Sequence, residues 1–249
     1  MEEILEHIKA FTPTSLGKMN AIKLLNRQDT KYLFHHRKLA TILDDLKQYY
    51  HVLEIEGQQL LSYENQYFDT RDFKFYNKHQ RGMLNRTKIR IRKYVESDLS
   101  FIEIKRKTNK SRTVKNRIPL IANEDIKSER VINFIQENSK ITAADLTEKL
   151  LISFQRITLA HKKLEDRCTL DINLRATWNG KDYNFEHLVI AELKQERFKH
   201  ASDFNLTLKK HKVYSESFSK YCFSFFNLNE DLKQNNFKPK IHQLNKILS

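Results

Sequence analysis

Two basic segments with a strict alternation of residue types most restrict how this chain can fold. They read RTKIRIRKY at residues 86–94 and FIEIKRK at residues 101–107. A period of two is typical of a β-strand with one buried face. In the first segment Lys88, Arg90 and Arg92 share one face, and isoleucines occupy the other. We therefore predict a hairpin with positive charge on one side and apolar side chains on the other.

Positively charged faces recur later in the chain, and carboxylates join them only singly. The further members of the pattern are Lys115 and Arg117, Arg156, residues 167–175, and Glu192 with Lys194. The exposed face of an ordinary sheet would mix both signs of charge and carry more Ser, Thr and Glu. Arginine also offers a planar fork of donors that matches phosphate oxygens in pairs. The pattern favours a face that binds a polyanion over a solvated outer face.

Like charges held this close repel each other, which predicts a bound partner. A pair about 4 Å apart costs on the order of 4 kcal/mol at an effective dielectric constant near 20. A polyanion would offset that repulsion. The single carboxylates Glu103, Asp171 and Glu192 suggest a divalent metal ion shared with phosphate oxygens. We predict a sheet that closes into a barrel, with cations and a few acids inside and helices outside.

The composition narrows the choice of partner and compartment. A net charge of +14 is typical of proteins that bind nucleic acid, acidic membranes or phosphorylated molecules. No signature of a common nucleic-acid module is present, and nucleic-acid binding would leave the single acids unexplained. Cys168 and Cys222 have no zinc-ligand spacing, the N-terminus does not read as a signal peptide, and no apolar run approaches roughly 20 residues. We expect a soluble, reduced, cytoplasmic protein whose membrane role, if any, comes from a partner.

The hydrophobic pattern predicts an α+β protein with an antiparallel sheet. Strands are expected at residues 29–34, 52–55, 60–67, 86–94, 101–107, 113–119, 151–160, 167–177, 183–185 and 188–194. Helices are expected at residues 4–11, 36–49, 123–136 with Asn123 as N-cap, 142–150, 202–210 and 217–225. Residues 52–67 are predicted to form a hairpin, 69–82 an irregular connection, and those after 227 a loose polar tail. We expect one domain over residues 1–249, with a core from about 11 to 225.

Short motifs in a fixed order carry a resemblance to a known family. They are NRQDTKYLF at residues 26–34, YFDT at 67–70, Tyr76, His79, NRTKIRIRKY at 85–94, FIEIKRK at 101–107, KNR at 115–117, Arg156, RCTLD at 167–171, ELK at 192–194 and FSKY at 218–221. From about residue 11 to residue 221, the chain resembles the VTC-type polyphosphate polymerase domain, a branch of the triphosphate tunnel metalloenzymes (CYTH superfamily).

The resemblance implies an antiparallel β-barrel tunnel, open at both ends, and a metal-dependent phosphotransferase. The implied reaction moves the γ-phosphate of ATP onto a growing inorganic polyphosphate chain. The implied phosphate-binding residues are Lys31, Arg90, Arg92, Lys105, Lys115, Arg156, Arg167, Lys194, Ser219 and Lys220, the last two from a helix at the tunnel mouth. The implied catalytic residues are Arg90, Arg92, Lys105, Arg156, Arg167 and Lys220. Glu192 would be the main ligand of a Mn²⁺ or Mg²⁺ ion, with Glu103 close by.

Two positions depart from the wider pattern, and two other functions stay open. Phe101 replaces the first Glu of the superfamily's ExExK strand, which fits the polymerase branch better than the simple triphosphatases. Phe154 stands where the polymerase family usually has Tyr, so one hydroxyl is missing from the phosphate path. The alternatives are a hydrolase of tripolyphosphate or of an organic triphosphate, and a non-catalytic polyphosphate-binding module. A pure binding module would not need a metal ligand such as Glu192.

The remaining candidates have ordinary structural explanations. We expect His35, His36 and His79 to be histidines on turns and not metal ligands, Asp69 to cap the following turn, and Trp178 to be structural beside a turn. The aromatic residues between 67 and 76 are expected to pack and not to stack a nucleobase. A basic loop is either a solvated surface or a lead-in for polyphosphate, and its members are Arg106, Lys107, Lys110 and Arg112.

Overall fold

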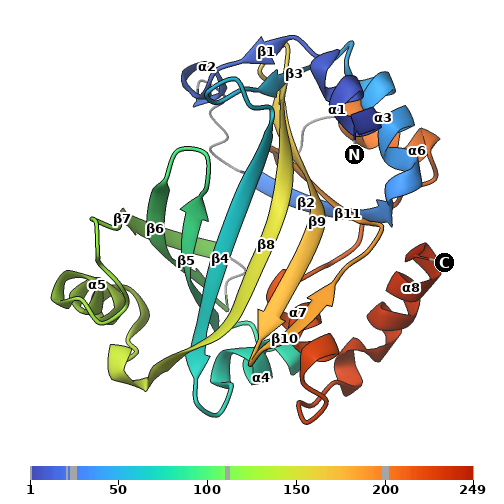
Figure 1. Ribbon diagram of the computed structural model, residues 1–249. Helices are drawn as coiled ribbons and strands as arrows, with labels where there is room; N and C mark the ends of the chain where they lie inside the picture. Colours follow the sequence, from blue (N-terminus) through green and yellow to red (C-terminus); the bar gives the residue numbers. More distant parts are fainter. Residues whose placement is uncertain (1, 21, 23–26, 110–112, 198–201, 249) are drawn as a thin grey trace.

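The computed structural model describes residues 2–20, 22, 27–109, 113–197 and 202–248 (Figure 1). Its strands are β1 (Pro13–Thr14), β2 (Arg27–His35), β3 (Tyr50–Leu53), β4 (Leu60–Thr70), β5 (Arg86–Tyr94), β6 (Leu99–Lys107), β7 (Thr113–Pro119), β8 (Leu146–His161), β9 (Asp166–Trp178), β10 (Lys181–Asn184) and β11 (Leu188–Glu196). Its α-helices are α1 (Glu2–Lys9), α2 (Leu16–Asn20), α3 (Leu39–Leu46), α4 (Lys74–Gln80), α5 (Glu129–Ser139), α6 (Asp203–Lys210), α7 (Lys220–Leu228) and α8 (Lys238–Leu248). Short 3₁₀ turns lie at His36–Lys38, Ala143–Asp145 and Asn235–Phe237.

One curled sheet organises the chain, and the predicted α+β class is confirmed. Its main path runs in the order β2-β11-β9-β8-β4-β5-β6-β7, and all neighbours on that path are antiparallel. Strands β1, β3 and β10 join it at the side. The sheet forms a half-barrel with edge strands β2 and β7, and helices surround it (Figure 1). This is the architecture of the triphosphate tunnel fold.

The two basic segments pair as predicted, as strands β5 and β6. Arg90 lies opposite Glu103, and Lys88 lies opposite Lys105. On the other face, Ile89 is fully buried and packs in a cluster with the α5 residues Val131 and Ile135. The alternation therefore separates a charged concave face from an apolar outer face, because successive strand residues point to opposite sides.

A second group of helices covers the outer face of the other half of the sheet. Figure 1 shows α1, α3 and α6 together at one end of strands β8, β9 and β11. The apolar stripe of α3, with Ile42 and Leu43 fully buried, packs against Ile157 of β8 and Leu170 of β9. The prediction that helices cover the apolar outer residues is confirmed at both ends.

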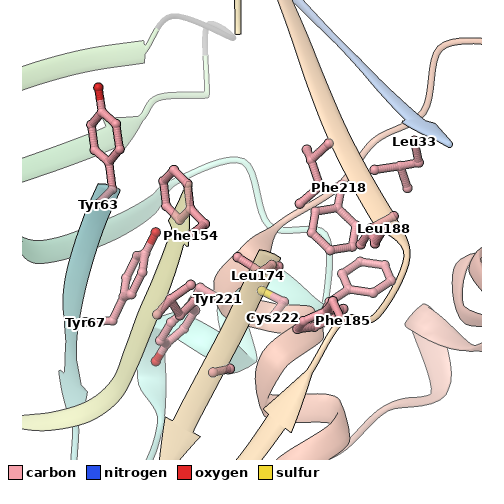
Figure 2. Packing of buried hydrophobic residues seen from close by; sticks show 14 of the residues in the cluster. Leu33, Tyr63, Tyr67, Phe154, Leu174, Phe185, Leu188, Phe218, Tyr221 and Cys222 are labelled. Atoms are coloured by element: carbon pink, nitrogen blue, oxygen red, sulfur yellow. The ribbon is translucent and has the colours of Figure 1, made fainter. Parts of the chain in front are cut away.

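Helix α7 packs on the concave side of the sheet and fills one part of it with aromatic rings. Figure 2 shows its residues Tyr221 and Cys222 among inward-pointing side chains of β4, β8 and β9. Tyr63 of β4 stacks on Phe154 of β8, with ring centroids 5.3 Å apart, and Tyr67 lies against Tyr221. The concave face is thus divided into an aromatic part under α7 and a charged part beside it.

Two predicted elements in the first third of the chain are wrong. Residues 52–55 and 60–67 do not form a hairpin, because β3 pairs with β8 and β1, while β4 pairs with β8 and β5. The connection 69–82 is not wholly irregular, since it contains α4. Asp69 starts that helix, because its carboxylate accepts the backbone N–H groups of Phe75 and Tyr76 at 2.8 and 2.9 Å. The expected capping role of Asp69 is confirmed.

Three later elements also differ from the prediction. Helix α5 begins at Glu129, and Ser128 precedes it at the N-cap position. Asn123 is therefore not the N-cap, and its left-handed φ of 67° differs from the extended backbone of an N-cap residue. Residues 146–150 belong to the long strand β8 and not to a helix, since Leu146, Leu150 and Ile152 point to the buried side. The polar tail ends in α8, whose buried Leu244 joins the aromatic cluster under α7.

None of the helices in the described residues is both long and apolar enough to cross a lipid bilayer.

Candidate active site

The cations predicted from the sequence meet on the concave face of the half-barrel. Lys105 of β6 illustrates this, because β6 and β11 are separated by four strands along the sheet. Burial lowers the pKa of Lys105, and the charges of Glu192 on β11 and Lys31 on β2 also act on it. Strands that are distant along the sheet therefore face each other across its hollow side. The strands β2, β11, β9, β8, β5, β6 and β7 each contribute a charged side chain.

Glu103 is the first of three carboxylates that each bridge two cations. Its Oε2 accepts from Arg90 at 2.5 and 2.8 Å, and its Oε1 accepts from Lys115 at 2.5 Å. Burial alone would raise the pKa of this carboxyl, but the charges of Arg90, Arg92 and Lys115 lower it to about 2. Glu103 is thus a fixed negative charge that holds strands β5 and β7 in place.

Asp171 is the second bridge, and it joins β8 to α7. Arg156 binds it through two parallel hydrogen bonds of 2.5 and 2.8 Å, and Lys220 at the start of α7 donates to the same carboxylate. All three side chains are at most 15% exposed. Burial, partly offset by Asp171, lowers the pKa of Lys220 to about 7. The site therefore contains a lysine that can hold or release a proton near neutral pH.

Glu192 is the third bridge and the most accessible of the three. It pairs with Lys31 on the neighbouring strand and with Lys194 at 2.8 Å. Burial acts to raise the pKa of this carboxyl, but the charges of Lys194 and Lys31 hold it well below its usual range. Its side chain is 18% exposed, compared with 2% for Glu103.

Several cations of the concave face have no carboxylate of their own within the described residues, and of these Arg92 is buried, Lys88 and Arg167 are half-buried and Lys105 is exposed. Among the described residues, Arg92 donates a hydrogen bond only through Nε, to Asn65 at 2.8 Å, and Lys88 donates to Ser219 at 3.0 Å. Lys105 makes no hydrogen bond or ion pair within the described residues. Nε of Arg167 is buried without a hydrogen-bond partner among them. Because buried polar groups are normally satisfied, the unpartnered Nε of Arg167 supports a site for an anion beside these cations.

The donor set fits a divalent metal ion only in combination with phosphate. Mg²⁺ and Mn²⁺ prefer oxygen ligands, and Mg²⁺ is usually bound by one or two carboxylates together with phosphates and water. Within the described residues, no group of three His, Cys, Asp or Glu side chains converges on the concave face. Glu192 can supply an oxygen because it is partly exposed, whereas Glu103 is enclosed between Arg90 and Lys115. Of the three bridging carboxylates, Glu192 is thus the one that fits a metal ligand, and the other ligand oxygens would have to come from a bound phosphate or from water.

Phe154, the departure from the family pattern, has a defined place in the site. Its ring stacks on Tyr63, and Nζ of Lys220 lies 3.9 Å from the ring centroid. Arg156 lies over the same ring at 5.2 Å. The aromatic face therefore supports two of the cations that Asp171 binds, even without a hydroxyl group.

Asp171, Lys88, Asn65 and Tyr67 were not among the implied phosphate-binding or catalytic residues, although Asp171 was expected beside a metal ion and Lys88 on the charged face. The strand register places Asp171 directly opposite Arg156, and that pairing would have identified it as the partner of this arginine. Asn65 and Tyr67 support the guanidinium groups of Arg92 and Arg90, but no pattern in one sequence marks a neutral partner of this kind.

Other candidates have structural roles. The aromatic residues Tyr67, Phe68, Phe75 and Tyr76 are buried, and Trp178 packs on Phe73 and Phe225. His79 lies 3.0 Å from the sulfur of Cys222 through Nδ1, and burial lowers its pKa to about 2. In the basic loop, Lys110 and Arg112 lie outside the described residues.

The depressed lysine pKa values predict that the ligand-free protein becomes more stable as pH rises from 7 to 8.5. Burial lowers the pKa of Lys88 to about 8 and that of Lys220 to about 7, whereas the unfolded chain keeps both near 10.4. In this window the unfolded state binds more protons, so the free energy of unfolding increases with pH, by about 2 kcal/mol in total. Urea unfolding of wild type and Lys220→Met at both pH values checks this, and the variant should show a smaller increase. An equal increase in both proteins would contradict the assignment to Lys220.

Comparison with known proteins places the chain in a family and a fold. The model of the VTC domain matches residues 26–228. A candidate adenylate cyclase from Bacillus halodurans has a similar structure, with 15% sequence identity and a TM-score of 0.54, and the match covers 78% of this chain and 96% of that one. A candidate adenylyl cyclase from Hippeastrum, described as having a dominant triphosphatase activity, matches with 12% identity and a TM-score of 0.46 over 80% of this chain and 94% of that one. None of the curated proteins matches.

Proposed function

The chain belongs to the VTC domain family, and from that membership we propose that it is an ATP-dependent polyphosphate polymerase. The observation that carries the proposal is the concave face, where cations outnumber the three bridging carboxylates. Such a face suits a chain of phosphates, because each added phosphate brings negative charge to otherwise repelling side chains. The family model spans residues 26–228, a range that includes all of the charged strands.

In the proposed reaction, an oxygen of the terminal phosphate of the polyphosphate chain attacks the γ-phosphorus of ATP. The bond between that phosphorus and the β,γ-bridging oxygen breaks, and ADP leaves with the bonding electron pair. The attacking phosphate oxygen is already anionic at neutral pH, so no protein base is required. Catalysis then consists of positioning the two phosphates and stabilising charge on the transferred group.

Arg90, Arg92 and Arg156 would hold the triphosphate, because guanidinium groups bind phosphate oxygens in pairs. Lys220 would add a positive charge where α7 begins, since a bound polyanion raises the pKa of a nearby lysine and favours its protonated form. A Mg²⁺ or Mn²⁺ ion, when bound, would neutralise charge on phosphate oxygens, with Glu192 as its protein ligand. Lys31 and Lys194 would keep the Glu192 carboxylate in place and ionised.

The test is incubation of the purified protein with ATP and Mn²⁺, followed by gel electrophoresis with a polyphosphate stain. We expect a ladder from wild type and a loss of about 10²-fold or more in rate for Glu192→Gln, since it removes a charged ligand oxygen. Arg175→Ala is the matched control, because Arg175 pairs with Asp182 in an exposed position outside the site. ADP and orthophosphate without a ladder would instead support a triphosphate hydrolase. Tight tripolyphosphate binding without turnover would support a non-catalytic module.

A further inference from the structure

Three histidines that are distant in sequence come together outside the proposed active site. They are His35 at the end of β2, His36 in the following 3₁₀ turn, and His187 just before β11. One ring nitrogen from each histidine can be chosen so that all three lie within 4.8 Å of one another. In the part of the chain that the structure describes, no other group of three His, Cys, Asp or Glu side chains brings its ligand atoms this close. His36 and His187 are exposed, and His35 is half-buried.

We propose that His35, His36 and His187 form a binding site for a transition-metal ion of the Zn²⁺ class, separate from the metal ion of the phosphate site. Imidazole nitrogens suit Zn²⁺, Ni²⁺, Cu²⁺ and Co²⁺, whereas Mg²⁺ and Mn²⁺ prefer oxygen ligands. Three histidines leave a fourth position on Zn²⁺ for water.

The distances between the rings fit such an ion. Nδ1 of His36 lies 3.2 Å from Nδ1 of His187. Two nitrogens on a tetrahedral Zn²⁺ ion, each at about 2.0–2.1 Å, are about 3.3 Å apart. The three ring centroids form a nearly equilateral triangle with sides of 5.0, 4.9 and 5.2 Å. The centre of this triangle lies about 2.9 Å from each ring centroid. A Zn²⁺ ion lies about 3.2 Å from the centroid of an imidazole ring that ligates it.

The backbone holds the three positions together without a metal ion. His35 is in register with Leu188 in the β2–β11 ladder, and the His36 N–H donates to the His187 carbonyl at 2.7 Å. His187 has a left-handed φ of 62°, which turns the chain into β11. Little chain entropy is therefore lost when an ion binds, because the ligands already lie on neighbouring segments.

His36 and His187 are the primary pair, and His35 completes the set. Nδ1 of His35 accepts a 3.1 Å hydrogen bond from the backbone N–H of Arg37. Ligation by His35 gives up that bond, and the exposed N–H then binds water. Substitution of His35 should thus lower the affinity for the ion less than substitution of His36 or His187.

Zn²⁺ binding to tag-free protein, measured by competition with a chromophoric chelator, tests the site. We expect one tight ion per chain and at least a 100-fold increase in Kd for the double variant His36→Ala/His187→Ala. Two control variants should bind Zn²⁺ with the affinity of wild type. They are His242→Ala, which removes a histidine of α8, and Glu192→Gln, which changes the phosphate site. Visible absorption of the Co²⁺-loaded protein should show the intense bands of low coordination number, and these should be absent from the double variant.

Two outcomes would overturn the proposal. Equal Zn²⁺ affinity in wild type and the double variant would exclude these histidines as ligands. Loss of the tight ion in Glu192→Gln would assign it to the phosphate site. Because His36 and His187 are exposed, their substitution should leave the urea midpoint unchanged in the presence of EDTA, and this confirms that the variant is folded. Polymerase activity is not a readout, so failure of the proposed function would leave this test intact.

Discussion

Arg92→Ala is expected to lower kcat with ATP by about 10²- to 10³-fold, the largest loss of activity that we predict for one side chain. Arg92 is 9% exposed, and within the part of the chain that the structure describes its one hydrogen bond runs from Nε to Asn65 at 2.8 Å. Its two terminal nitrogens therefore remain available as a fork for phosphate oxygens. Burial lowers its pKa, as do the charges of Arg90 and Arg156, so a phosphate that offsets this repulsion should bind strongly.

Arg92→Lys separates the charge of this residue from its geometry. Lysine keeps the positive charge but lacks the planar fork. We expect it to recover most of the tripolyphosphate affinity but little of kcat, because catalysis depends on the position of the transferred phosphate. Arg175→Ala should retain wild-type kinetics. If Arg92→Ala kept more than a tenth of wild-type kcat with its fold intact, the transfer would take place elsewhere on the concave face.

The charged strands could be predicted from the sequence because their signal is local. In β5 and β6, alternation alone separates Arg90 and Lys105 from the apolar Ile89 and Ile104, and the pairing follows from a short connection. Strand β3 could not be placed in the same way. Its partner β8 lies about a hundred residues away, so nothing in the neighbouring sequence distinguishes that pairing from a hairpin with β4.

The sequence predicted which charged residues lie in the site better than it predicted which of them pair with one another. A basic strand shows which cations exist, but a bridge such as Arg156–Asp171–Lys220 depends on the position of α7, which is set by packing of Tyr221 and Phe225 in the aromatic cluster. His35 and His36 were interpreted singly as turn residues, and His187 was not considered. Only the pairing of β2 with β11 brings His187 beside His35 and His36.

Asp171→Asn is expected to destabilise the ligand-free protein by about 3–5 kcal/mol, the largest stability change that we predict. The carboxylate is 4% exposed and satisfies both Arg156 and Lys220. Without it, two buried cations face each other with no negative partner. For a chain of this length the loss corresponds to about 10 °C in melting temperature. Asp182→Asn is the matched control, because the Arg175–Asp182 pair is exposed and contributes about 0–1 kcal/mol.

The pH dependence of this loss distinguishes a charge effect from a packing effect. Removal of Asp171 takes away the charge that favours protonated Lys220, so its pKa falls further below 7. Lys220 can then release its proton in the folded state, whereas Arg156 cannot. The destabilisation, measured by urea unfolding, should therefore be larger at pH 6 than at pH 8.5. Tripolyphosphate at about 100 times its Kd should restore ~2.7 kcal/mol, because it binds only the folded state. A loss that neither pH nor tripolyphosphate changes would mean that Asp171 acts through packing, and the concave face would then not be a site balanced by an anion.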